Sequence, residues 1–133
     1  MPKILIVDDE HSQTEVLKLL FSLEGFEAAV AFNGKDALAQ LERVRPDVIV
    51  TDYSMPLMNG GELVKLVRAS SQHAKLPIVM TTATQARHIE HAELCNAILR
   101  KPYLWDDLIA TVNRILPPPP PPPPPVRAAD AAD

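Results

Sequence analysis

The sequence predicts a doubly wound α/β domain with five parallel strands. Five short apolar runs recur along the chain, and stretches with apolar residues at helical spacing lie between them. The runs are continuous, which is typical of strands that are buried on both faces. Strands that alternate with helices are joined by right-handed crossovers, so that helices cover both faces of a parallel sheet.

The expected strands are centred on residues 4–7, 28–30, 48–50, 78–80 and 97–99. Four helices are predicted from apolar positions at core spacing. These positions are Val16, Leu19, Leu20 and Leu23; Ala37, Leu38, Leu41 and Val44; Leu63, Val64 and Val67; and Trp105, Leu108, Ile109, Val112 and Ile115. We expect a further helix within residues 85–94, where only Ala86, Ile89 and Leu94 are apolar and form no clean stripe.

The chain has room for one domain, which we place at residues 1–116. Nine consecutive prolines from Pro117 to Pro125 end the last helix at Leu116. They predict a polyproline II rod of roughly 28 Å that acts as a spacer or linker, in preference to a ligand for an aromatic groove. Residues 126–133, rich in Ala and Asp, are expected to be disordered.

Composition argues against several classes of protein. The net charge is −4 and no basic run occurs, so a nucleic-acid binder is disfavoured. The single cysteine, Cys95, excludes an intrachain disulfide and a cysteine-rich zinc site. The apolar run that begins at Ile4 gives way to Asp8 too soon for a signal peptide or a membrane span. We therefore expect a cytoplasmic protein.

Polar residues follow four of the expected strands. They are Asp8 and Asp9, Asp52, Thr82 and Lys101. Ligands bind beyond the carboxyl ends of the strands in an open parallel sheet, so these side chains should converge. Crowded carboxylates favour a hard cation with oxygen ligands, and Mg²⁺ fits because it needs only one or two carboxylates. An ionised aspartate beside that ion can attack phosphorus, while Lys101 offsets negative charge on the transferred oxygens.

Each residue also has a structural interpretation. Asp8 or Asp9 could cap the first helix, and Thr82 could cap another. Asp52 could form a turn ahead of Pro56. A lone lysine such as Lys101 is usually a solvated charge. These interpretations do not explain why the residues occur together at four strand ends.

At this point the sequence resembles a known family, the receiver domains of two-component response regulators, from Lys3 to about Leu116. The resemblance rests on four motifs, whose order and spacing are specific. They are residues 4–10 (ILIVDDE), residues 47–56 (DVIVTDYSMP) followed by Asn59-Gly60, residues 77–83 (PIVMTTA), and Lys101-Pro102-Tyr103. It implies a flavodoxin-like fold with strand order 2-1-3-4-5.

The resemblance also implies the roles of residues. Asp52 would be the phosphoacceptor, and Lys101 would bind the phosphoryl group through a cis Lys101-Pro102 bond. Thr82 would be the switch hydroxyl. The metal ligands would be Asp8 (mostly through water), Asp9, Asp52 and the backbone carbonyl of Ser54. The implied partner is a histidine kinase or histidine phosphotransfer protein, and the assembly state, with a homodimer among the options, is left open.

The chain departs from the family pattern in three places. Ile98 stands where many receivers have Tyr or Phe. The stretch from Thr82 to Lys101 is about three residues shorter than is common in the family. Cys95-Asn96-Ala97 replaces the usual Gly-Ala before the fifth strand. These departures concern how a signal would be passed on.

Three other functions compete with a phosphoacceptor. A haloacid-dehalogenase-type phosphatase would need an Asp-x-Asp motif after the first strand, which Asp8-Asp9-Glu10 does not match. A flavodoxin-type flavin carrier is disfavoured by acidic strand ends. A degenerate receiver is disfavoured by the complete set of site residues.

Overall fold

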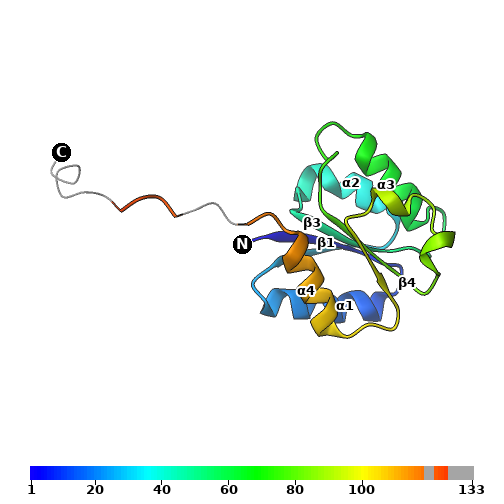
Figure 1. The fold of residues 1–133 in the computed structure, drawn as a ribbon, viewed down its shortest axis with the longest axis horizontal. Helices are drawn as coiled ribbons and strands as arrows, with labels where there is room; N and C mark the ends of the chain where they lie inside the picture. Colours follow the sequence, from blue (N-terminus) through cyan, green and yellow to red (C-terminus); the bar gives the residue numbers. More distant parts are fainter. Residues whose placement is uncertain (119–121, 126–133) are drawn as a thin grey trace.

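The computed structural model describes residues 1–118 and 122–125 (Figure 1). Five strands form one parallel sheet in the order β2-β1-β3-β4-β5. The strands are β1 (Lys3–Val7), β2 (Glu27–Ala31), β3 (Val48–Asp52), β4 (Ile78–Thr82) and β5 (Ala97–Arg100). The predicted fold class and strand order are confirmed.

Four α-helices cover the sheet, two on each face. They are α1 (His11–Leu23), α2 (Gly34–Val44), α3 (Gly60–Ala69) and α4 (Trp105–Ile115). In Figure 1, α2 and α3 lie on one side of the sheet, and α1 and α4 lie on the other. None of the helices within the described residues is long and apolar enough to span a membrane.

Alternation along β1 shows how the strands supply both cores. Leu5 and Val7 belong to the cluster packed beneath α2 and α3, whereas Ile4 and Ile6 belong to the cluster beneath α1 and α4. Successive side chains of a strand point to opposite faces, so a central strand needs apolar residues at every position. This requirement explains the continuous apolar runs.

The predicted core face of α1 is wrong. Val16, Leu19 and Leu23 are 56%, 60% and 74% exposed, and Leu20 is half-buried. The buried residues of this helix are instead Thr14, Leu17 and Phe21, which are also three and four residues apart. Two stripes were available at helical spacing, and packing against the sheet selected the one that includes the large Phe21 ring.

The helix expected within residues 85–94 is also absent. Two short 3₁₀-helices, Ala86–His88 and Ala92–Leu94, occupy this segment. Among the residues of this segment whose burial is described, only Ile89 is buried, while Ala92 and Leu94 are partly buried against the same core. His91 has a left-handed φ of 59°, which an α-helix does not accommodate. The described apolar residues provide too little burial to hold an α-helix against the sheet.

Asn33 and Asn59 cap the first turns of α2 and α3. Each is an N-cap residue whose side-chain oxygen accepts a hydrogen bond from a backbone N–H three residues later, at 2.7 and 2.9 Å. The α4 helix ends at Ile115. The expectation for residues 126–133, and part of that for the proline run, concerns residues outside those described.

Arg68, near the end of α3, connects three segments. Its guanidinium donates to the carbonyl oxygens of Leu94, Ala74 and Leu76 at 3.0, 3.2 and 2.7 Å. It also donates to the Asn96 side chain at 2.9 Å, which in turn accepts from the Ile78 N–H. The planar array of donors suits several acceptors at once. Arg68 therefore ties the start of β4 to the segment that precedes β5.

Replacing Arg68 by Lys should lower the free energy of unfolding by about 1–3 kcal/mol, because one ammonium cannot reach four acceptors. Urea denaturation measures this change. Arg114→Lys is the matched control, since Arg114 is exposed in the last turn of α4, and it should alter stability by no more than about 0.5 kcal/mol. Equal effects of the two substitutions would contradict the role given to Arg68.

Candidate phosphoacceptor and metal site

The candidate site lies at the carboxyl edge of the sheet. β1 ends at Val7 and is followed by Asp8 and Asp9, whereas Asp52 is the last residue of β3. Thr82 is the last residue of β4, and Lys101 follows β5 directly. The Lys101 N–H donates to the Thr82 carbonyl at 2.8 Å. Parallel pairing thus places these strand ends at one edge, as the sequence predicts.

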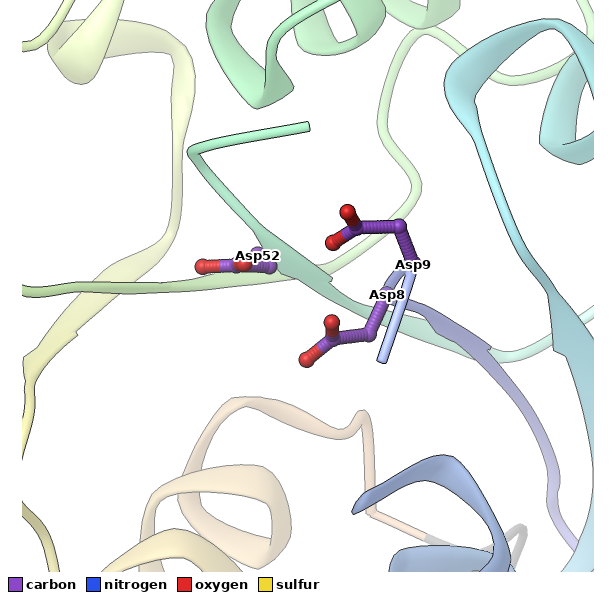
Figure 2. Close-up of side chains that lie close together, drawn as sticks. All are labelled: Asp8, Asp9 and Asp52. Atoms are coloured by element: carbon purple, nitrogen blue, oxygen red, sulfur yellow. The ribbon is translucent and has the colours of Figure 1, made fainter. Parts of the chain in front are cut away.

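Three carboxylates converge there. Asp8, Asp9 and Asp52 each offer one oxygen, and these oxygens all lie within 4.8 Å of one another. Their side chains project to the same side of the strand ends (Figure 2). Asp8 and Asp52 are only 4% and 9% exposed, whereas Asp9 is exposed to solvent. The cluster is therefore half enclosed, with its open side at Asp9.

Lys101 contributes the positive charge in contact with this cluster. Its Nζ lies 3.3 Å from Oδ1 of Asp52, and both side chains are largely shielded from solvent. The Lys101-Pro102 peptide bond is cis, as the resemblance implied. The ion pair places Lys101 beside the carboxylate that is expected to react.

Burial dominates the electrostatics of the two enclosed carboxyls. It raises the pKa of Asp8, against the hydrogen bond from the Glu10 N–H, and the charge of Asp52 raises it further. Burial also raises the pKa of Asp52, against the lowering effect of Lys101. The positive charge of Lys101 thus does not offset the cost of burying these two carboxylates beside a third, and a bound cation would lower both pKa values.

The donor set fits Mg²⁺. Two ligands on opposite sides of this ion lie about 4.2 Å apart, since each bond is about 2.1 Å long. No two of the three carboxylate oxygens lie more than 4.8 Å apart, so a small adjustment would let them share one ion. Ser54 is exposed two residues after Asp52, where its carbonyl could serve as a further ligand. Oxygen donors are those that Mg²⁺ prefers.

The helix-cap roles considered for Asp8, Asp9 and Thr82 are not observed. Neither Asp8 nor Asp9 is the N-cap of α1, because that position belongs to Glu10. Asp8 instead accepts a hydrogen bond from the Glu10 N–H at 3.0 Å. Thr82 does not cap an α-helix, because the next elements along the chain are two 3₁₀-helices and β5. Its hydroxyl oxygen accepts from the Thr84 N–H at 2.9 Å. Thr82 is almost fully buried at its strand end.

Tyr103 is a neighbour of the site that the sequence reasoning did not assign a role. Burial raises the pKa of its phenol, and the negative charges of Asp8 and Asp52 raise it further. Tyr103 also lines an apolar pocket of about 530 Å³ with Lys101, Trp105 and residues of α1. Its position directly after Lys101-Pro102 was the available signal.

Comparison with known proteins agrees with this geometry. The family model for the response regulator receiver domain matches residues 4–113. The sensory transduction protein RegX3 of Mycolicibacterium smegmatis is 36% identical over 119 residues, which cover 87% of this chain and 51% of RegX3. The chain thus spans about half the length of this curated relative.

Solved structures show the same fold. Chemotaxis protein CheY4 of Vibrio cholerae superimposes with a TM-score of 0.81 at 35% identity, covering 87% of this chain and 99% of that one. Response regulator TrrA of Thermotoga maritima, solved in complex with Mg(2+)-BeF, has a TM-score of 0.78 at 28% identity, covering 87% and 100%. Because the family model matches most of the chain, the chain belongs to the receiver domains of response regulators.

Proposed function

We propose that this chain is a phosphoacceptor in a two-component phosphorelay. Asp52 would take a phosphoryl group from a histidine kinase or histidine phosphotransfer protein, and the modified domain would signal through protein contact. The observation that supports this proposal best is the position of Asp52, beside two further carboxylates and 3.3 Å from the Lys101 ammonium. The Mg(2+)-BeF complex named for TrrA supports the same chemistry.

The proposed step is a transfer between two bonds to phosphorus. An oxygen of the ionised Asp52 carboxylate forms a P–O bond while the P–N bond of the donor's phosphohistidine breaks. The electron pair of the broken bond stays with the imidazole, which then takes up a proton from solvent. The product on this chain is an acyl phosphate.

Asp8, Asp9, Asp52 and the Ser54 carbonyl would hold Mg²⁺. When bound, this ion supplies positive charge that balances the oxygens of the transferred group. Lys101, whose Nζ lies 3.3 Å from Oδ1 of Asp52, places a second positive charge beside the acceptor and would bind a phosphoryl oxygen. The Thr82 hydroxyl, whose oxygen accepts from the Thr84 N–H, would donate its proton in a hydrogen bond to another phosphoryl oxygen.

The domain would catalyse its own phosphorylation and dephosphorylation only. We place it at residues 1–116, with the proline run as a spacer, and expect it to act in the cytoplasm without binding nucleic acid directly. A phosphatase of the haloacid-dehalogenase type stays disfavoured, because Asp52 lies at the end of β3 and the residues after β1 lack the Asp-x-Asp motif.

Asp52→Asn should abolish covalent labelling when the chain is incubated with Mg²⁺ and a small phosphodonor such as acetyl phosphate, since an amide oxygen is not an effective nucleophile. Intact-mass spectrometry detects the added phosphoryl group, and peptide mapping locates it. Asp106→Asn, at an exposed position in the first turn of α4, should label like the unmodified chain. Labelling of Asp52→Asn at the normal rate would refute the assignment.

Asp8→Asn should raise the melting temperature in the absence of metal by about 2–5 °C at pH 7, because it removes a buried like charge and retains the oxygen that accepts from Glu10. The same variant should lose most of the stabilisation that millimolar Mg²⁺ gives the unmodified chain. Asp9→Ala should weaken Mg²⁺ binding more than Asp8→Ala.

Differential scanning fluorimetry and titration calorimetry measure these effects. Asp106→Asn again serves as the control and should keep the full response to Mg²⁺. An Asp8→Asn variant that melts at a lower temperature and still responds fully to the ion would rule out the charge-crowding argument.

Lys101→Gln should raise the apparent pKa of the Asp8–Asp52 pair further, because the Lys101 charge opposes the upward shift at both carboxyls. Carboxyl ¹³C NMR titration without metal measures this value. A pKa that is raised on folding stabilises the protein below the ordinary value of 3.8, and this contribution disappears as the pH rises through the folded-state pKa. A titration midpoint of these carboxyls that is unchanged or lower in Lys101→Gln would contradict the effect assigned to the Lys101 charge.

A further inference from the structure

The connection between β4 and β5, residues 83–96, is held at its middle by Glu90. The Glu90 N–H donates to Oη of Tyr53 at 3.2 Å, and Oε2 of Glu90 accepts from Nδ2 of Asn59 at 3.3 Å. The adjacent Ile89 is buried in the core beneath α2 and α3. Glu90 therefore contacts the connection's neighbours through both its backbone and its side chain.

The groups that Glu90 contacts are linked to the proposed phosphoacceptor through the chain and through one backbone hydrogen bond. Tyr53 directly follows Asp52 in the chain. Asn59 caps α3 with its Oδ1 while its Nδ2 bonds to Glu90. One residue later, the Gly60 N–H donates to the Tyr53 carbonyl at 2.8 Å. A movement at Asp52 would thus be transmitted to Tyr53 and to the first turn of α3.

Two glycines make these close contacts feasible. A Cβ at Gly60 would lie 2.6 Å from the Asp52 carbonyl oxygen, and a Cβ at Gly61 would overlap the Glu90 carbonyl. Backbone from three segments therefore meets without intervening side chains. Such contact transmits small displacements, because packed backbone has little freedom to absorb them.

The two ends of the connection are held separately. Its first turn bonds to the Thr82 hydroxyl through the Thr84 N–H, and its last residues bond to Arg68 through Leu94 and Asn96. Only 3₁₀-helices lie between these ends. A segment with few internal hydrogen bonds and one buried anchor has low local stability, and can be biased by a few contacts.

We infer that Glu90 is a positioning residue that couples residues 83–96 to Asp52 through Tyr53 and Asn59. The inference rests on the proposed function, and it names the route by which phosphorylation is passed to the surface of the domain. Ile98 on β5 has no ring that could swing, and its β-branched side chain has few rotamers to exchange. The clasp formed by Tyr53, Asn59 and Glu90 provides a route that needs no rotamer change at position 98.

The test is hydrogen exchange with mass spectrometry on the full chain, with and without Mg²⁺ plus beryllofluoride as a phosphoryl mimic. Exchange in residues 83–96 of the unmodified chain should change by at least threefold on adding the mimic. Tyr53→Phe, which removes only a hydroxyl, and Glu90→Ala should each lose most of this response. Glu90→Gln, which keeps a side-chain acceptor for Asn59, should retain it, as should the control Glu93→Ala at an exposed site in the same segment.

Coupling must be reciprocal, so the affinity for the mimic should change in Tyr53→Phe and Glu90→Ala by the same factor, about three- to tenfold for a lost hydrogen bond. A purely structural role would speed exchange equally with and without the mimic and leave its affinity unchanged, which would overturn the inference. The inference would also be overturned if exchange in residues 83–96 of the unmodified chain did not change on adding the mimic.

Labelling of Asp52 by acetyl phosphate, followed in the same samples, separates the two proposals. If Asp52 is labelled but exchange in residues 83–96 does not respond to the mimic, only the coupling is refuted. Loss of labelling in the unmodified chain refutes the proposed function, and with it the inference.

Discussion

The crowding of three carboxylates at one edge of a parallel sheet is the constraint on which the rest of the site depends. Asp8, Asp9 and Asp52 are brought together by strand pairing and not by mutual attraction. Water screens the repulsion between exposed charges, but the burial of Asp8 and Asp52 removes most of this screening. The free energy gained by packing the sheet therefore maintains an arrangement that is unfavourable until a cation joins it. Lys101 relieves only part of the repulsion.

The packing that sustains this arrangement lies on both faces of the central strands. β1, β3 and β4 present continuous apolar residues to two separate clusters, so a strand end cannot shift without disturbing both. The edge strand β5 is less buried. The rigid strands thus place Asp52 and the acidic pair. The connection between β4 and β5 is held by hydrogen bonds that it accepts from Arg68 and Asn59 and one that it donates to Tyr53. Rigidity at the reacting group and low stability beside it are properties suited to a switch.

The prediction for α1 was wrong because two faces of this helix have apolar residues at the same helical spacing. Helix α1 has apolar residues on more than one side, so Val16 and Leu19 fitted a core stripe as well as Leu17 and Phe21. The choice depends on how the helix rotates against the sheet, which local spacing does not encode. The prediction for residues 85–94 was wrong for the opposite reason: its three apolar residues form no clean stripe, and the segment forms two short 3₁₀-helices with Ile89 buried between them.

The sequence by itself determined the parallel sheet, its strand ends and the residues at its carboxyl edge, because continuous apolar runs and the polar residues that follow them are local signals. Tertiary structure alone decided which face of α1 is buried, and that Glu90 reaches Tyr53 and Asn59. Those contacts join residues 37 and 31 positions apart, and no periodicity links them. Their geometry arises only when α3 and the β4–β5 connection pack together, with Gly60 and Gly61 allowing backbone to approach backbone.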